Sequence, residues 1–320
     1  MSCRFVSPYL PAEQDCRWLR GNHHGHTTLS DGADDPAETL QAYEAAGYDY
    51  LALSEHDLLA DPADYQPLTR MTLLPAVEIT SRAEQTLMYL GARRSFPEAR
   101  RLSLGELSAW VAAAGGLFVA DHPNWLYLPM RRHLCLAELL AAPAVGAMEI
   151  YTGVIERLPG EAGALDLWDR LLSSGRVVYG HAVDDQHAAQ DRFLGWNVVQ
   201  WPAGAAVTAG GIVEALRLGR FYASTGVRVS RLALSADGGR VEIASDASRI
   251  RWLVRDGRLA AQSDGGAATL ALEELAASPL LNHPWRSFEA PEEMLYLRAE
   301  LLGDGGRRAW TQPFFIEPAA

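Results

Sequence analysis

The feature that most constrains the fold is a repeating order of short apolar runs and capped helical patterns between about residues 18 and 226. In one repeat Ser103 and Glu106 form a capping box, Gly115 ends the helical pattern, and residues 117–120 make the apolar run that follows. Strands that alternate with helices in this way pair in parallel, because the helix carries the chain back to the same end of the sheet. The sequence therefore predicts an α/β fold with a largely parallel sheet.

The character of the sequence changes after Val227, where apolar and polar residues alternate. Ile250, Trp252 and Val254 face one way in such a pattern, as in a β-strand with one buried face. Residues 295–301 and 310–316 have the composition of further strands. We therefore expect two domains, an α/β domain over residues 1–227 and a small antiparallel β domain over residues 228–320.

The net charge and the cysteines limit the classes of function. Forty acidic against 28 basic residues give a net charge of −12, which repels a nucleic-acid backbone. The three cysteines form no C-x-x-C pair, and no apolar stretch reaches the roughly 18 residues that span a membrane. We expect a cytoplasmic protein that binds a small molecule and neither nucleic acid nor a membrane.

Five polar clusters follow or end the apolar runs. The first, His24-Gly25-His26-Thr27-Thr28-Leu29-Ser30-Asp31-Gly32, has two histidines one residue apart on an extended segment, which can turn toward one metal. The others end or follow predicted strands, one of them at residues 177–179: Ser54-Glu55-His56-Asp57, Pro75-Ala76-Val77-Glu78, Asp121-His122 and Asp184-Asp185-Gln186-His187. Because the carboxyl ends of parallel barrel strands share one face, these clusters predict a single metal site.

A structural role is the alternative for each of these residues taken alone. A single histidine near a strand end more often caps a helix or makes a satisfied polar contact, and a single carboxylate often caps a helix or turn. Five such clusters in equivalent places favour a common site. Three histidines fit none of the clusters and are expected to serve structure or solvent: His23, His133 and His283.

The motifs occur in the order H-x-H-T-x-x-S-D-G, S-E-H-D, a strand that ends in Glu78, D-H-P and D-D-x-H. In this order the chain resembles the PHP (polymerase and histidinol phosphatase) superfamily over about residues 18–226. Residues 214–226 and 309–313 further resemble the branch that contains carbamate-insecticide hydrolases. The resemblance implies a distorted seven-stranded β/α barrel with two or three divalent metal ions.

The resemblance also implies eight metal ligands. They are His24, His26, Asp31, His56, Glu78, His122, Asp185 and His187. Imidazoles mixed with carboxylates suit Zn, Mn or Fe. The chain departs from the superfamily at Asn22 and Glu55, where Asp is frequent, and it has no histidine between Glu78 and His122, where many relatives place a further ligand. A third metal therefore stays open.

Residues beside the ligands are candidates for catalysis and substrate binding. His181 is the candidate general acid, with bonding to a backbone carbonyl as the alternative, and Asp57 and Asp184 could orient the imidazoles. Three arginines near the clusters could bind a phosphate or carboxylate, or be surface charge: Arg131, Arg132 and Arg192. Three aromatic residues could line a pocket or pack in the core: Trp125, Tyr127 and Trp196.

Three functions compete at this stage. Two metals that activate a hydroxide suit attack at phosphorus, so the favoured function is hydrolysis of a small phosphorylated metabolite. The same site could hydrolyse a carbamate, an amide or a carboxylic ester. A metal-binding module without turnover is the third alternative, and the complete set of ligand positions argues against it. An arginine close to the metals would favour the first function over the second.

Overall fold

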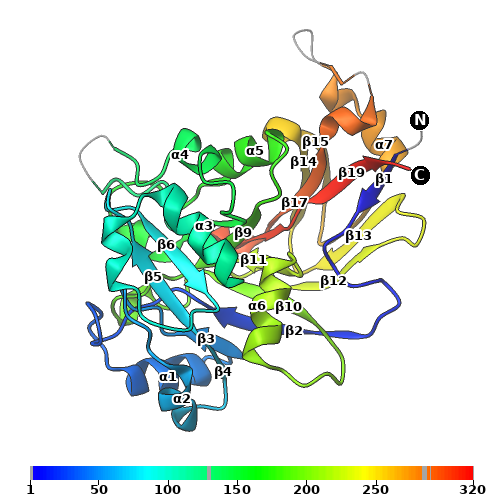
Figure 1. Cartoon of the computed structure of the whole chain (residues 1–320). Coiled ribbons are helices and arrows are strands. Elements are labelled where there is room, and N and C mark those ends of the chain that lie inside the picture. Colours follow the sequence, from blue (N-terminus) through cyan, green and yellow to red (C-terminus); the bar gives the residue numbers. More distant parts are fainter. Residues whose placement is uncertain (1–2, 128–130, 283–286, 289, 320) are drawn as a thin grey trace.

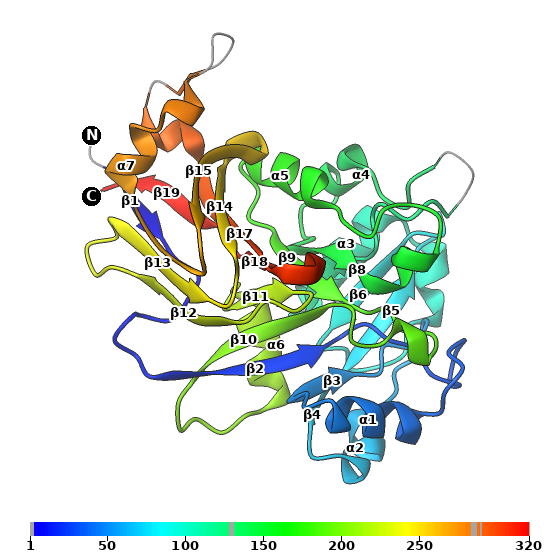
Figure 2. The same cartoon turned by 180° about the vertical axis from the view of Figure 1, so that it is seen from behind.

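The structure of the chain is a computed structural model that describes residues 3–127, 131–282, 287–288 and 290–319. It has a mixed α/β architecture (Figures 1 and 2). Both ends of the chain lie in a sheet-rich region, where β1 (Cys3–Val6) pairs antiparallel with β19 (Phe314–Pro318). His283, one of the histidines set aside above, lies outside the described residues.

The helix start predicted at Ser103 is present, since α3 (Leu104–Ala114) has the complete capping box of Ser103 and Glu106. α1 (Pro36–Ala45) is capped by Asp35, which accepts a hydrogen bond from the Glu38 N–H at 2.8 Å. The other α-helices are α2 (Pro62–Tyr65), α4 (Leu136–Leu140), α5 (Leu165–Ser173), α6 (Ala209–Arg217) and α7 (Leu272–Ala276). Across the described ranges, no helix has the length and apolarity to cross a membrane.

A five-stranded sheet forms one side of the α/β part. Its strands, in spatial order, are β5 (Ala76–Thr80), β6 (Thr86–Leu90), β7 (Leu117–Ala120), β8 (Ala147–Thr152) and β9 (Tyr179–Val183). β7, β8 and β9 are parallel, as predicted, whereas β6 runs antiparallel to both of its neighbours. The prediction of parallel pairing is wrong for β6 because residues 81–85 between β5 and β6 are too few for a crossover connection.

A larger sheet contains eleven strands among the described residues. Its strands β1 and β19 are followed in spatial order by β17 (Tyr296–Leu302), β18 (Arg308–Thr311), β11 (Phe221–Ser224), β10 (Trp196–Pro202), β2 (Cys16–Asn22), β3 (Tyr50–Ala52) and β4 (Thr72–Leu74), with β14 (Arg249–Val254) and β15 (Arg258–Asp264) beside β17. A small sheet of β12 (Val229–Leu234), β13 (Arg240–Ser245) and β16 (Ala267–Ala271) packs nearby (Figure 2).

The larger sheet runs without a break from the first part of the chain into its C-terminal part. Tyr222 of β11 is paired with Thr311 of β18, so strands on either side of the predicted boundary at Val227 share one sheet. The strand predicted at residues 310–316 is two strands, β18 and β19, because Pro313 between them has no N–H to donate to a ladder. The boundary itself and the seven-stranded barrel stay predictions.

Two single β-bridges connect the two large sheets. His56, just after β3, is bridged in parallel to Glu78 of β5, and Gly25, just after β2, is bridged in parallel to Gln186, just after β9. The carboxyl ends of strands from both sheets therefore meet at one place. Side chains from distant parts of the sequence are brought together there.

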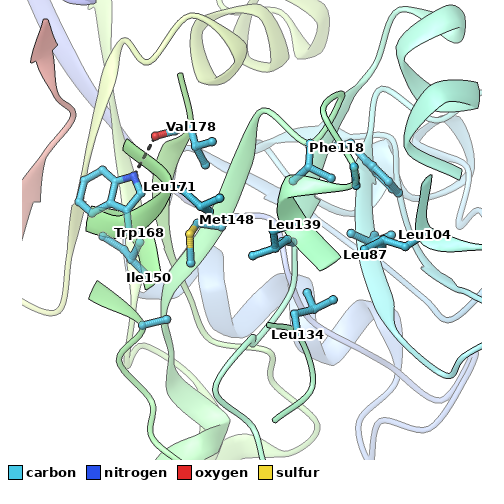
Figure 3. Close-up of a cluster of buried hydrophobic side chains, with 14 of the residues drawn as sticks. Leu87, Leu104, Phe118, Leu134, Leu139, Met148, Ile150, Trp168, Leu171 and Val178 are labelled. Atoms are coloured by element: carbon cyan, nitrogen blue, oxygen red, sulfur yellow. Dashed lines mark hydrogen bonds between the residues drawn. The ribbon is translucent and has the colours of Figure 1, made fainter. Parts of the chain in front are cut away.

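The core beneath this meeting point fixes the strands that carry it. Trp168 of α5 is fully buried and its indole N–H donates to the carbonyl of Val178 at 2.8 Å (Figure 3). Phe118, Met148 and Ile150 of β7 and β8 lie in the same cluster. Burial of each such side chain stabilises the fold by about 1.5–3 kcal/mol, which holds the strand ends in register.

Candidate metal centre

Histidine and carboxylate side chains converge at the bridges between the two large sheets. Their candidate ligand atoms fall into overlapping groups, and the atoms of each group lie within 4.8 Å of one another. Three of these groups together contain all eight predicted ligands: His26, Asp31, His56 and His187; His24, His26 and Glu78; and His24, His122 and Asp185. The sequence prediction of a single site is thus matched by one cluster in space.

Glu78 lies at the centre of the cluster. Its Oε2 atom is 2.9 Å from Nδ1 of His56 and 3.2 Å from Nε2 of His26, and its Oε1 atom is 3.3 Å from Nε2 of His122. The side chain is only 1% exposed. A buried carboxylate that faces imidazoles from three strand ends is well placed to bridge two metal ions.

Several atoms of the cluster are buried without a hydrogen bond in the described part of the chain. They include Oε2 of Glu78, Oδ1 of Asp185 and the Nε2 atoms of His24 and His26. Asp185 Oδ1 is nevertheless 3.2 Å from each of those two Nε2 atoms. A buried polar atom without a partner costs about 1–3 kcal/mol, so lone pairs directed at one small region are better explained as ligands. This nitrogen and oxygen donor set fits a divalent metal ion.

The charges of the cluster favour bound cations. Burial alone would lower the pKa of His56, but Glu78 and Asp31 outweigh burial and raise it to about 11. Burial would likewise lower the pKa of His187, which hydrogen bonding to Asp31 and the charge of Asp185 raise to about 9. Burial would raise the pKa of Asp185, but the neighbouring imidazoles, His24 first, lower it to about 2. The carboxylates thus stay ionised at neutral pH. Their negative charge favours positive charge on the neighbouring imidazoles, and a bound metal ion would supply positive charge in the same place.

Sequence reasoning missed Glu149, a fully buried residue of β8. Its Oε1 atom is 2.5 Å from Nδ1 of His24, and its Oε2 atom accepts hydrogen bonds from the His122 backbone N–H at 2.7 Å and the Thr152 hydroxyl at 2.8 Å. An Nδ1–H that donates to Glu149 leaves Nε2 of His24 as the free lone pair toward Glu78 and Asp185. A single carboxylate within the apolar run 147–152 is the only local signal.

We expect Glu149→Gln to weaken metal binding about 10–100-fold, the usual effect of losing the carboxylate behind a metal-bound histidine. The glutamine amide keeps the shape of the side chain but removes the charge that orients His24. Calorimetric titration of the metal-free protein with Zn²⁺ or Mn²⁺ measures the change. Glu156→Gln is the control, since the exposed Glu156 contacts Tyr151 and no imidazole. Equal affinities of the two variants would rule out this role for Glu149.

Glu55 stabilises the loop of the first motif through hydrogen bonds and does not itself face the cluster. It accepts hydrogen bonds from the backbone N–H and the hydroxyl of Thr27, at 3.1 and 2.6 Å, and from the hydroxyl of Ser30. Gly32 closes the same loop, where a Cβ atom would lie 2.4 Å from the His26 carbonyl oxygen. Glu55 therefore holds the loop that carries His26 and Asp31.

The prediction that His181 is the general acid finds no support. The residue lies inside β9, which begins at Tyr179, two residues later than the strand predicted at 177–179. Its fully buried ring packs 4.5 Å from the ring of Phe221 and 4.8 Å from that of His23. Burial lowers the pKa of His181 to about 3, so the ring is neutral and a weak proton donor at neutral pH.

The two predicted catalytic aspartates are engaged elsewhere. Asp57 accepts a backbone N–H of β5 at 2.9 Å and the Nε–H of Arg100 at 3.0 Å. Asp184 is buried and accepts the backbone N–H groups of residues 193–195, together with the Tyr43 hydroxyl at 2.6 Å. Neither borders the cavity beside the cluster. Both hold segments next to the predicted ligands in place through hydrogen bonds.

The cavity beside the cluster has a volume of about 290 Å³. Among the described residues, none of the three predicted substrate-binding arginines lines it. Arg192 is bonded to Asp34, and Arg131 and Arg132 line a separate cavity. The arginine that does line the cavity is Arg157, which no sequence motif marked. An arginine therefore lines the cavity at a position that was not predicted.

Besides the predicted ligands, aromatic and apolar side chains form an apolar wall of the cavity. Trp125, one of the three predicted aromatic residues, lines it, whereas Tyr127 and Trp196 line other cavities. Val154, Ile155 and Leu158 complete this wall.

His133, which sequence reasoning set aside, lies beside the cluster. Its Nε2 atom accepts the Thr86 backbone N–H at 2.8 Å, and its ring is 4.6 Å from that of His122. It thus contacts the segment between Glu78 and His122, in which this chain has no histidine. The backbone of residue 133 donates to the Trp125 carbonyl at 2.8 Å, a loop closure that no local pattern indicates.

Comparison with solved structures identifies a similar fold. A two-domain protein from Bacteroides vulgatus that contains a predicted PHP-like metal-dependent phosphoesterase matches 83% of this chain over 87% of its own, with 17% identity and a TM-score of 0.52. A putative metal-dependent phosphoesterase from Bifidobacterium adolescentis (17% identity, 62% of this chain, 96% of its own) and an amidohydrolase from Chromobacterium violaceum (18%, 53%, 89%) give TM-scores of 0.42 and 0.41. The sequence matches no protein-family model and no curated protein. The assignment of a PHP-like fold with a sheet-rich C-terminal region rests on the first match.

Proposed function

We propose that the chain is a metal-dependent phosphoesterase that hydrolyses a small phosphorylated metabolite. The observation that carries this proposal is the convergence of eight imidazole and carboxylate ligands at the strand ends of a PHP-like fold. Two or three ions of Zn, Mn or Fe, when bound there, would activate water and neutralise charge on the phosphoryl group. The ligand Asp31, whose side chain is 54% exposed, marks the side open to solvent.

Arg157 supports phosphorus chemistry over carbonyl chemistry. It lines the same cavity as His56, Glu78 and Asp185. A guanidinium beside the ligands would bind the oxygens of a phosphate with paired hydrogen bonds. The buried carboxylates would hold the imidazoles, while Arg157 would orient the anionic substrate.

Hydrolysis of a carbamate, an amide or a carboxylic ester is the second candidate. The apolar wall of the cavity favours it, because an uncharged substrate would lose little hydration there. The charge of Arg157 is also already paired with Asp191, at 2.5 Å. A neutral substrate would therefore leave no charge without a partner.

Phosphate release from a panel of nucleotides, sugar phosphates and simple alkyl phosphates tests the proposal. We expect release by Mn- or Zn-reconstituted protein, and its loss in His56→Ala and after chelation of the metal. Bound metal without release from any ester would favour the second candidate. A protein that binds no divalent metal would refute the site assignment itself.

We also propose the finer organisation predicted from the sequence. The two single bridges support a closed barrel, since they join both edges of the five-stranded sheet to the segments after β3 and β2. Those two strands and the five of the sheet would make the seven. Residues 228–320 would form the second domain, and the protein would act in the cytoplasm.

A further inference from the structure

The cavity beside the metal cluster is lined by two chemically different kinds of residue. The predicted ligands are one kind. The other is an apolar wall of four residues, Trp125, Val154, Ile155 and Leu158, and Arg157 also lines the cavity. Carbon surface cannot pair with hydroxyl groups, so a wall of this kind favours an apolar group over a polyhydroxylated one.

A single turn and the residue after it, Leu158, supply three of the four residues of the apolar wall. The 3₁₀ segment η3 (Gly153–Arg157) follows β8 directly, and its Val154 N–H donates to the Asp184 carbonyl at 2.9 Å. Val154 and Ile155 are almost completely buried. The wall is therefore fixed to the same strand ends that carry the ligands, so its position relative to the ligands is also fixed.

Trp125 is held by a short pairing of two loops. It forms an antiparallel bridge with Gly160, and the N–H of Leu126 donates to the Pro159 carbonyl at 2.9 Å. Gly160 has φ of 128°, and a Cβ atom there would lie 2.5 Å from the Asn124 carbonyl oxygen, so only glycine allows this approach. The ring packs edge-on against His122, with 5.1 Å between ring centroids. The indole is thus placed rigidly beside a metal ligand.

Arg157 is fixed as firmly as the wall. Its Nε and Nη2 atoms donate to the two carboxylate oxygens of Asp191, at 2.5 and 2.9 Å. Asp191 also accepts the backbone N–H groups of His187 and Ala188, at 3.2 and 3.0 Å. Asp191 therefore connects the guanidinium of Arg157 to the loop that carries His187. The side chain is 45% exposed, and its opposite edge, with Nη1, makes no hydrogen bond within the described residues.

We propose that the substrate is a phosphoester whose alcohol part is one apolar ring or short branched chain, with its phosphate between the metal ligands and Arg157. This inference rests on the proposed phosphoesterase function. The hydroxyl groups of a sugar would lose their water against the wall formed by Trp125, Val154, Ile155 and Leu158 without new partners. The volume of about 290 Å³ lies at the lower end of ligand sites and suits one ring.

Benzyl phosphate and ribose 5-phosphate are a matched pair of probes. Both release a primary alcohol, so a difference in kcat/KM reports recognition of the alcohol part rather than its leaving ability. We expect the reconstituted wild-type protein to prefer benzyl phosphate by about 10-fold or more. Equal rates, or a preference for ribose 5-phosphate, would overturn the inference and leave the phosphoesterase proposal intact. No phosphate from either probe or from the wider panel, with metal bound, would overturn both.

Two pairs of variants locate the recognition. Trp125→Ala should remove the preference for benzyl phosphate, whereas Tyr127→Ala, on a neighbouring aromatic residue outside the cavity, should keep it. Arg157→Gln should lower kcat/KM about 10-fold or more for both probes, mainly through KM, and Arg131→Gln should not. Metal content measured on each variant separates recognition from damage to the cluster. A preference that survives Trp125→Ala in a metal-loaded protein would contradict the assignment of the wall.

Discussion

Glu78→Gln should reduce phosphate release by more than 100-fold and remove at least one metal ion per chain. The carboxylate is buried and faces His26, His56 and His122 at 2.9 to 3.3 Å, so in the proposed site its charge would serve more than one metal ion. Loss of a carboxylate behind a metal ligand costs about 10–100-fold, and loss of a bridging ligand should exceed that. Metal content by atomic absorption, measured together with phosphate release, checks both parts of the expectation.

Glu214→Gln is the matched control for this experiment. It makes the same chemical change on α6, where Glu214 is about half exposed and paired with Arg217 of the same helix. The thermal transition of both variants without metal shows whether Glu78→Gln still folds. A folded Glu78→Gln protein with full metal content and full activity would contradict the central place of Glu78 and, with it, the two-metal arrangement.

The convergence of the eight proposed metal ligands could be predicted from the sequence because they occur in short motifs at strand ends. His24 and His26 are one residue apart after β2 and both reach the cluster, as expected for side chains that alternate along an extended segment. Asp185 and His187 are also one residue apart, after β9, but Asp185 has φ of 51°, so the pattern there gave the residue types and not the directions of the side chains. The parallel order of strands then brings the motifs together, which needs only the fold class.

Glu149 and Arg157 could not be found in this way. Glu149 is one carboxylate inside an apolar strand, and its partner His24 is 125 residues away in the sequence. Arg157 follows an apolar turn, and its place in the cavity depends on Asp191, in the loop after β9. Both roles come from tertiary contacts that leave no periodicity or motif.

The misplacement of His181 has a related cause. The strand was predicted to end at Tyr179, because the apolar run ends there and a polar string over residues 180–187 follows. In the structure Gly180 and His181 continue β9, and the His181 ring is buried against the rings of Phe221 and His23. Strand prediction from apolar runs fails where a strand carries a glycine and a polar residue into the interior.

Removal of Arg298 should be the most destabilising single change in the C-terminal region. Arg298 of β17 is 1% exposed and donates from Nε and Nη2 to Asp169 of α5 at 2.8 and 2.6 Å, while the Tyr296 hydroxyl donates to the same carboxylate at 2.8 Å. Arg298→Met leaves the Asp169 charge buried without its ionic partner, which should lower the free energy of unfolding by about 3–5 kcal/mol. Urea denaturation followed by circular dichroism measures this loss.

Two further variants decide whether the buried ion pair is the cause. Arg251→Met removes a half-exposed arginine from the same sheet, where Glu300 keeps Arg308 as a neighbour at 3.6 Å, and should cost about 1 kcal/mol or less. The double change Asp169→Leu with Arg298→Met removes both charges and should recover much of the lost stability.

The same measurement tests how the C-terminal strands relate to the metal-binding part. Asp169 lies on α5, whose Trp168 packs in the core beneath β8 and β9, so the ion pair joins that core to β17. If the strands after Val227 formed an independent appendage, Arg298→Met would leave the unfolding of the metal-binding part unchanged and split the transition in two. One cooperative transition at lower urea is the expected result, because the larger sheet and this ion pair both cross from one part to the other.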